Sequence, residues 1–459
     1  MSLRSKLYKL WNAKRKINMS PTQTIALTFA TIIFIGAMLL TLPVASRSGE
    51  SCGFLSALFT ATSSTCVTGL VLFDTWTQWS GFGQVVIICL IEIGGLGFMS
   101  AASLVVFLLR KKVGLKQRMV IAQALSVSDM DSVVRLQKWV LVGSLSIQFA
   151  GAAVLFLRFL PEFGWARALK WGVFHSVSAF CNAGFDIFGV IAPGQNMIAF
   201  NHDPVVCIVI MLLVTLGGLG FFVWEEVVRL HSWKKFSVYT KLVLLMSGAL
   251  LLGGAVLIAL LEWNYPATLG PMPVWQKILN AFFQSTTVRT AGFGSIDQAA
   301  MTDAGKAVSA ILMLIGGSSG STAGGMKTVT VVVIVLFLWT RARGKETVCV
   351  FKRTIPQTQV VDAMTISGIM LCLALVGGVF ISATCGVGFL DAMYEAVSAL
   401  ATVGLTAGVT GELTIPAQIL IIIYMYFGRV GVLTISLGFL IGNRAEERYR
   451  YANTNLLIG

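Results

Sequence analysis

The sequence is poor in charge: only 12% of its 459 residues are Asp, Glu, Lys or Arg, whereas 56% are hydrophobic. This composition excludes an ordinary soluble domain and is typical of a chain that crosses the membrane several times. The eight cysteines form no Cys-x-x-Cys pair, which argues against a zinc site or a disulfide framework. No nucleotide-binding loop is present either. We therefore expect no cofactor on this chain, and energy or gating input from ion gradients or a partner.

Basic residues outnumber acidic ones, and most of them are clustered. Of the 34 Lys and Arg residues, 25 lie in residues 1–18, 110–138, 229–241, 341–353 and 442–459. Cytoplasmic loops of membrane proteins carry an excess of Lys and Arg, so we expect all five clusters and both termini on the cytoplasmic side of the cell membrane. Topology then explains the charge, and we expect no nucleic-acid partner. The first 18 residues lack an apolar core, which indicates a cytoplasmic segment and not a signal peptide.

One short pattern recurs four times along the chain. Each copy is an apolar run that ends in small or polar residues, followed by one glycine and then Leu or Phe. The glycines are Gly69, Gly184, Gly292 and Gly404, at spacings of 115, 108 and 112 residues by subtraction. A nearly constant period indicates that the chain is built from four copies of one unit.

Each unit contains one spanning segment, one short apolar segment, a polar loop and a second spanning segment. About 20 apolar residues are needed to cross a membrane, so the short segments at 54–65, 168–180, 275–288 and 389–400 must enter from the outer face and return. Eight spans result, which keeps both termini inside. The expected units are repeat 1 (24–109), repeat 2 (136–230), repeat 3 (238–340) and repeat 4 (360–441), with cytoplasmic segments at 1–23, 110–135, 341–359 and 442–459.

The four polar loops indicate a pore lined by backbone oxygens. Irregular backbone at membrane depth is tolerated only where it lines a cavity, and fourfold pseudosymmetry places the loops around one axis. Glycine permits conformations that turn carbonyls inward, and a ring of carbonyls can replace the hydration shell of a monovalent cation. A packing turn repeated by duplication is the alternative. The expected filter residues are Cys66, Val67, Thr68, Gly69, Asn182, Ala183, Gly184, Thr290, Ala291, Gly292, Thr402, Val403 and Gly404.

The second span of the third unit differs from the others. It covers 38 residues, 303–340, and residues 316–325 include five Gly and three Ser. Such a run has low helix propensity, so we expect a break below the third filter loop that could open or block the pore. Close helix packing through Gly-x-x-x-Gly spacing is the alternative. The expected gate consists of Gly316, Gly317, Ser318, Ser319, Gly320, Ser321, Thr322, Ala323, Gly324 and Gly325, with Lys327 and Arg429.

Several charged residues lie close to the expected pore. Arg429 stands where the other units have glycine; it would form either an electrostatic barrier below the filter or an ion pair with Glu92. Lys327 could hold the glycine-rich loop closed, and we expect Arg289 to brace the third filter from behind. Three acids follow the filters on the outer side and either concentrate cations there or are ordinary loop residues: Asp74, Asp186 and Asp297.

These motifs resemble the Trk/Ktr/HKT superfamily of potassium transporters, most closely its Ktr-type membrane subunits, over essentially the whole chain. The most specific stretches are 65–70, 180–186, 289–293, 401–405 and the glycine-rich 316–328. The resemblance implies a homodimer in membrane lipid, bound to a cytosolic ring of nucleotide-binding RCK-type regulatory subunits. Glycine in all four filters implies potassium as the substrate, with sodium left open. We expect the partner to bind 110–138, 229–241 and the C-terminal tail.

The expected fold is an all-α polytopic membrane protein, with four pseudo-symmetric repeats of transmembrane helix, pore helix, filter loop and transmembrane helix around a central pore. The expected function is channel-like potassium uptake, and not an enzymatic activity. A secondary carrier of another solute, coupled to a sodium or proton gradient, is the main alternative; it would typically show inverted halves with broken helices in both. A serine protease built on Ser318 or Ser319 would need a nearby base, but the three histidines are expected at membrane boundaries: His175, His202 and His231.

Overall fold

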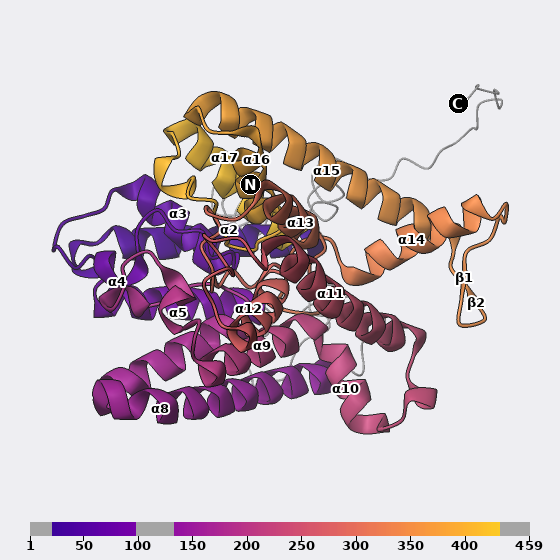
Figure 1. Ribbon diagram of the computed structural model, residues 1–459, viewed down its shortest axis with the longest axis horizontal. Coiled ribbons are helices and arrows are strands. Elements are labelled where there is room, and N and C mark those ends of the chain that lie inside the picture. Colours follow the sequence, from indigo (N-terminus) through magenta and orange to yellow (C-terminus); the bar gives the residue numbers. More distant parts are fainter. Residues whose placement is uncertain (1–20, 98–132, 432–459) are drawn as a thin grey trace, which may run out of the picture.

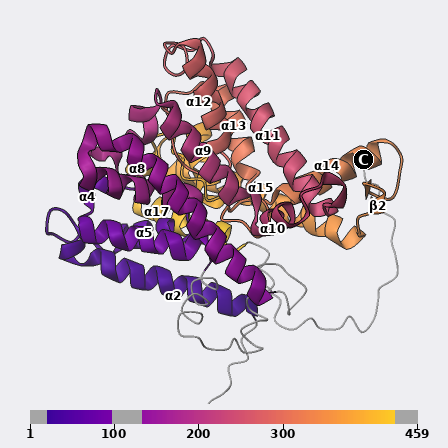
Figure 2. The same cartoon turned by 90° about the horizontal axis from the view of Figure 1, so that it is seen from below.

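The computed structural model describes residues 21–97 and 133–431. The regular secondary structure of the described residues is helical, apart from a hairpin of two short strands, β1 (Cys349–Val350) and β2 (Arg353–Thr354). In Figure 1 the long helices α8 (Val133–Phe180) and α15 (Gln357–Cys385) lie along opposite edges of the molecule, with shorter helices between them. Figure 2 shows the same helices from below.

The helices follow one another in four groups along the chain. The first group is α2 (Pro21–Thr41), α3 (Phe54–Thr65), α4 (Thr75–Gln78) and α5 (Gly81–Gly95), and the second is α8, α9 (Pro204–Leu219) and α10 (Phe221–Leu230). The third is α11 (Val238–Glu262), α12 (Val274–Thr287), α13 (Asp303–Leu314) and α14 (Thr328–Ala342), and the fourth is α15, α16 (Phe389–Leu400) and α17 (Ile415–Val430). Five 3₁₀ turns connect them: η1 (Pro43–Ala45), η2 (Phe188–Val190), η3 (Asn196–Phe200), η4 (Trp233–Lys235) and η5 (Thr410–Glu412).

Helix α8 combines two of the expected segments. Gly164 has φ 74° and ψ 168°, which no α-helix contains, so the chain turns there between a long helix and a shorter one. Glycine tolerates this conformation because it has no Cβ. The shorter helix corresponds to the expected segment 168–180, and it ends beside the second filter loop.

In the first, second and fourth groups, glycines also determine how the second spanning helix packs and where it ends. A methyl group at Gly94, Gly217 or Gly428 would strike the backbone carbonyl of Thr65, Phe180 or Leu400, respectively. These carbonyls lie at the C-terminal ends of α3, α8 and α16, so the glycines allow direct backbone contact between the two helices. Three positions further on, Gly97, Gly220 and Gly431 have φ values of 80°, 92° and 94° and end the helical path.

One sequence expectation about the second group is wrong. Residues 204–229 were expected to form one continuous span, and only the third group was expected to contain a broken one. Helices α9 and α10 instead meet at Gly220 with a bend of 95°. In the third group, the helix ends at Leu314 and resumes at Thr328. Broken second helices therefore occur in both halves of the chain.

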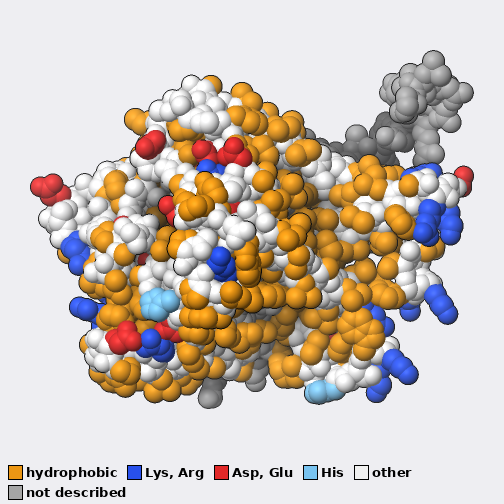
Figure 3. All heavy atoms as spheres, viewed as in Figure 1, with side chains coloured by type: hydrophobic (Ala, Val, Ile, Leu, Met, Phe, Trp, Pro, Cys, Tyr) orange, Lys and Arg blue, Asp and Glu red, His pale blue; other side chains and the backbone are white. Residues whose placement is uncertain are grey.

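The length and composition of the described helices fit a membrane environment. Helices α2, α8, α11 and α15 are each long and apolar enough to cross a membrane, and the α9–α10 pair adds a fifth candidate among the described residues. The expected spans at 82–109 and 415–441 run beyond the described part of the chain. In Figure 3 hydrophobic side chains cover the middle of the visible face, and Lys and Arg side chains gather at the end with α10, α14 and the hairpin.

Candidate functional site

The four repeated glycines form a closed ring. A methyl group built on any of them would lie no more than 2.8 Å from a carbonyl oxygen of the neighbouring loop. Gly69 meets the carbonyl of Ala183, Gly184 that of Ala291, Gly292 that of Val403 and Gly404 that of Thr68. Each loop therefore touches the next, and the fourth returns to the first. Segments more than 100 residues apart in sequence meet at one point.

The backbone of the four loops follows one conformational pattern. The residue two positions before each glycine is left-handed although it is not glycine: Val67, Asn182, Thr290 and Thr402, with φ between 52° and 66°. Such values are uncommon for residues with a Cβ, and they persist only where the surroundings impose them. The ring glycines are also left-handed, with φ between 67° and 97°. Two left-handed residues, two positions apart, therefore recur in all four loops.

Side chains of the short helices hold the loops from behind. Ser63 Oγ accepts a hydrogen bond from the Gly69 amide at 3.1 Å, and Ser398 Oγ accepts one from the Gly404 amide at 3.0 Å. In the second loop Ser178 Oγ donates to the Phe185 carbonyl at 2.7 Å. Two of these bonds hold a ring-glycine amide, and the third holds the carbonyl that follows Gly184.

Arg289 lies behind the third loop and not inside the ring. Its side chain is only 9% exposed, and it donates to the hydroxyl of Ser247 at 3.2 Å and to the Ser247 carbonyl at 3.4 Å. Ser247 belongs to α11, so the guanidinium links the third filter loop to a long helix. This geometry matches the bracing role and not direct contact with an ion.

A cavity of about 390 Å³ opens on one side of the ring, and all four ring glycines line it. Asp74, Asp186 and Asp297 line the same cavity. Asp186 accepts a hydrogen bond from the Phe188 amide at 3.0 Å. Burial raises the pKa of the Asp186 carboxyl to about 7, and the nearby Asp74 adds to this shift. The three acids therefore lie in the cavity that leads to the ring.

The glycine-rich loop between α13 and α14 lies against the other side of the ring. Thr322 donates through its hydroxyl to the Phe180 carbonyl at 3.2 Å and through its amide to the Gly217 carbonyl at 3.2 Å. A methyl group at Gly324 would strike the hydroxyl of Thr402, a filter residue of the fourth loop. The loop thus touches the base of the second and fourth filter loops.

The same loop is tied to the bend between α9 and α10. The Ser318 amide donates to the Gly218 carbonyl at 3.0 Å, and the Gly320 carbonyl accepts from the Phe221 amide at 2.8 Å. Tyr239 of α11 donates to the Ser319 carbonyl at 2.9 Å. Sequence reasoning missed this tyrosine, because its partner is a backbone oxygen that leaves no pattern in the side chains.

Two cations bind backbone oxygens around the loop. Lys327 donates to the Ala323 carbonyl at 2.8 Å and so bridges one end of the loop. Arg429 donates to the Thr322 carbonyl, to the Gly94 carbonyl and, at 2.9 Å, to the Gly95 carbonyl. The guanidinium therefore joins α17, the glycine-rich loop and the end of α5.

The alternative ion pair between Arg429 and Glu92 is not formed. Glu92 Oε2 instead accepts hydrogen bonds from Gln148 at 3.0 Å and from the Cys181 thiol at 3.4 Å. The carboxylate thus stands behind the second filter loop, within the membrane-spanning region.

The serine protease alternative has no support in the described residues. Ser318 Oγ lies 3.2 Å from the Thr328 hydroxyl, and Ser319 contributes a backbone carbonyl to the Tyr239 contact. His175 is buried beside Phe188, with the two rings stacked 3.8 Å apart. Its ring nitrogens interact with the Trp171 carbonyl and the Ile187 amide. This histidine holds the second filter loop in place.

The fold and the ring define a class: a polytopic helical membrane protein in which short helices direct four backbone loops to one axis. The family model of TrkH, described as a cation transport protein, matches residues 4–448. The chain belongs to this family of cation transporters, whose members are not enzymes.

Individual relatives cover nearly the same length. The chain is 40% identical to the potassium/sodium uptake protein NtpJ of Enterococcus hirae, over 96% of this chain and 98% of that protein. It is 39% identical to the Ktr system potassium uptake protein B of Bacillus subtilis, over 94% and 96%. The crystal structure of the potassium transporter TrkH from Vibrio parahaemolyticus matches with a TM-score of 0.72 at 17% identity, over 92% of this chain and 86% of that one. This structural match shows the fold.

Proposed function

We propose that the chain is the membrane subunit of a channel-like potassium uptake system. The observation that carries the proposal is the closed ring, in which each glycine contacts a carbonyl of the next loop. Such a ring offers several backbone oxygens to one dehydrated cation, and carbonyl oxygens favour large monovalent ions. The filter residues would be those between Cys66 and Gly69 and their counterparts in the other three loops. The names of the relatives point to potassium, and one of them also to sodium.

The glycine-rich loop is the proposed gate. It lies directly below the ring and connects α13 to α14. It is rich in glycine, whose backbone changes conformation easily. Arg429 and Lys327 place positive charge beside it, which raises the energy of a cation that leaves the filter. An open state requires that Thr322 and Arg429 separate, because their hydrogen bond holds the loop in its present position.

One structural observation favours the carrier alternative, and another argues against it. Broken second helices in both the second and third groups are a feature that coupled carriers share. A carrier does not require four left-handed backbone turns that meet in one ring. Passive flux of ⁸⁶Rb⁺ into liposomes without sodium or proton gradients separates the two. The channel proposal predicts measurable flux, whereas a strictly coupled carrier would show none until a gradient of the coupling ion is imposed.

We further propose a homodimer in the cytoplasmic membrane, with both termini and the basic segments in the cytoplasm. The concentration of Lys and Arg at the end with α10, α14 and the hairpin supports this orientation. The cytosolic partner would be a ring of RCK-type regulatory subunits. Of its expected surface, residues 229–241 lie within the described structure, whereas residues 110–132 and 442–459 lie outside it. Charge reversal at Lys116 and Arg118, followed by a pull-down with such a subunit, tests this surface; undiminished binding would argue against it.

A further inference from the structure

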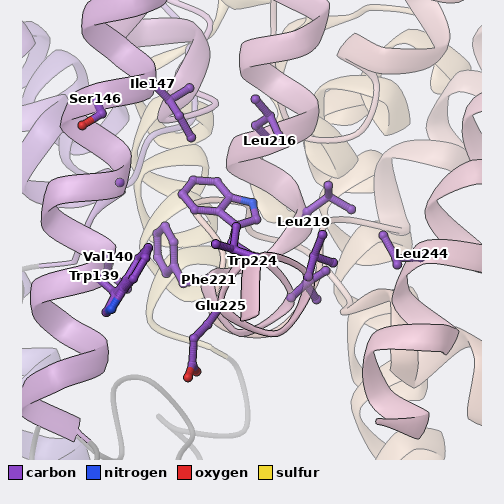
Figure 4. Close-up of a pocket in the computed structure, with 14 residues that line it drawn as sticks. Trp139, Val140, Ser146, Ile147, Leu216, Leu219, Phe221, Trp224, Glu225 and Leu244 are labelled. Carbon is purple, nitrogen blue, oxygen red and sulfur yellow. The ribbon is translucent and has the colours of Figure 1, made fainter. Parts of the chain in front are cut away.

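Away from the ring, the structure contains a second cavity, of about 420 Å³, between α8, α9, α10 and α11. Its volume falls in the range of roughly 300–1,000 Å³ that is usual for ligand pockets. Figure 4 shows Trp224 in the middle of it, with Val140 on the α8 side and Leu216 and Leu219 on the α9 side. Nearly all lining residues are apolar, and the Glu225 carboxylate points away from Trp224 in this view.

One residue of α8 that lines this cavity is a glycine, Gly143, which has no side chain to fill it. A methyl group at Gly143 would meet only the ring of Trp224, at 3.9 Å, which is ordinary van der Waals contact. By contrast, methyl groups at Gly151 and Gly172 of the same helix would lie 2.8 Å from neighbouring atoms. Gly143 is therefore not needed for close helix packing. The space it leaves is available to a molecule from outside.

Trp224 carries a polar atom that the protein does not satisfy. Its indole nitrogen is buried and has no hydrogen-bond partner among the described residues. In Figure 4 this nitrogen lies on the Leu216 and Leu219 side of the ring, within the cavity wall. A buried indole N–H usually finds an acceptor. The nitrogen itself has almost no accessible surface, so an occupant of the cavity would contact the apolar part of the ring.

Basic residues adjoin one end of the cavity. Lys234 and Lys235 are exposed on η4, directly after α10, and Lys241 lies one turn before the lining residue Leu244 on α11. Arg229 follows the lining residue Val228 and pairs with Glu225 at 3.6 Å, with its side chain 67% exposed. These four cations outnumber the two neighbouring acids, Glu225 and Glu226, which favours an anionic head group at this end.

We propose that this cavity binds one acyl chain of an anionic phospholipid from the cytoplasmic leaflet. The chain would occupy the space beside Gly143, against the apolar part of the Trp224 ring. The phosphate would lie toward Lys234, Lys235 and Lys241. A lipid is the occupant because the apolar cavity lies among membrane-spanning helices, and because its basic end faces the side on which the basic segments gather.

The cavity shares a wall with the loop below the ring. Phe221 lines the cavity, and its amide donates to the Gly320 carbonyl at 2.8 Å. A bound chain supports α10 in its bent position and so holds the loop where it is. This consequence for transport rests on the proposed gate, whereas lipid binding does not.

The test uses the full-length protein in nanodiscs that contain phospholipids with a photoreactive diazirine on the acyl chain. Phosphatidylglycerol and phosphatidylcholine with identical chains are compared, and the labelled peptides are mapped by mass spectrometry. Gly143→Leu fills the cavity without a backbone clash. Gly368→Leu on α15 is the matched control, because a methyl group there meets nothing within 4 Å and the residue is remote in sequence from the cavity lining.

We expect labels on the peptides around 139–147 and 216–228, several-fold more from phosphatidylglycerol than from phosphatidylcholine. Gly143→Leu should remove these labels while Gly368→Leu keeps them. Equal labelling by the two lipids, or labels that persist in Gly143→Leu, would overturn the proposal. Both results are independent of ion flux, so they remain informative even if the proposed gate is wrong.

Discussion

The Arg429 guanidinium donates a hydrogen bond to the Thr322 carbonyl, across 107 positions of sequence. It also donates to the Gly94 and Gly95 carbonyls at the end of α5. One side chain thus connects the first, third and fourth groups of helices directly below the ring. A planar guanidinium can bind several acceptors in fixed directions, which an ammonium group cannot do.

Loss of this side chain should loosen the loop and lower the barrier below the ring. We expect Arg429→Gln to raise ⁸⁶Rb⁺ flux into liposomes by about ten-fold, which corresponds to about 1.4 kcal/mol. Arg429→Lys keeps the charge but not the fork, so its flux should lie between those of Arg429→Gln and the parent protein. A flux equal to that of the parent in both variants would show that Arg429 only supports packing.

Substitution at a ring glycine should impair selectivity. Gly69→Ser introduces a Cβ 2.5 Å from the Ala183 carbonyl oxygen, in a left-handed conformation that disfavours side chains. We expect the ratio of sodium to potassium uptake to rise several-fold in a strain that lacks its own potassium transport. Gly81→Ser is the control, because a methyl group there meets nothing within 4 Å. An unchanged ratio in Gly69→Ser would contradict the proposed filter.

Removal of the glycine-rich loop tests the gate separately from the filter. Deletion of Ser318–Ala323 eliminates the contacts with Phe180, Tyr239 and Arg429 but leaves the four filter loops intact. Potassium flux should increase several-fold and depend less on a cytosolic subunit, while the potassium-to-sodium ratio stays nearly constant. A folded, dimeric deletion variant with the flux of the parent would show that the loop serves packing alone.

Asp186 predicts a dependence on external pH. Burial raises the pKa of its carboxyl to about 7, so it is mainly protonated at pH 6 and ionised at pH 8. Cation flux at low external potassium should therefore be higher at pH 8, because a carboxylate at the mouth attracts cations. Asp186→Asn should flatten this profile, whereas Asp297→Asn should not. A pH profile that is unchanged in Asp186→Asn would assign the dependence to another group.

The raised pKa of Asp186 also predicts how the stability of the protein depends on pH. The folded-state pKa lies above the ordinary value of 3.8, so ionisation disfavours the folded state. The cost is absent below pH 3.8 and increases toward pH 7, above which it is complete. Asp186→Asn should therefore raise the melting temperature at pH 8 more than at pH 5. An equal rise at both values would contradict the buried carboxyl.

The sequence reveals the ring because a repeated glycine is visible without a structure. The nearly constant spacing of Gly69, Gly184, Gly292 and Gly404 indicates equivalent loops, and the short helices α3 and α16 have the expected bounds of 54–65 and 389–400. Low helix propensity likewise predicts an interruption between α13 and α14, where the structure has one. These features depend on local backbone preferences, which can be predicted from the residue types in each segment.

Other features depend on tertiary contacts that no pattern in the sequence indicates. The apolar run through Gly220 continues without interruption into Phe221, so the bend of 95° is invisible until the glycine-rich loop takes its place beside it. The partners of Arg429 are backbone carbonyls, whereas a sequence suggests only an acid such as Glu92. The left-handed Val67 and Thr402 carry no propensity signal either, because their conformation is imposed by the neighbouring loops.

The central claim is that potassium binds within the ring formed by Gly69, Gly184, Gly292 and Gly404. Anomalous diffraction from crystals grown in Tl⁺, a potassium substitute with strong anomalous scattering, tests it most directly. The account predicts one or more peaks on the axis, coordinated by carbonyl oxygens of all four loops and displaced by excess potassium but not by equal sodium. Absence of a peak within the ring, while Tl⁺ occupies a site elsewhere along the pore, would contradict the account.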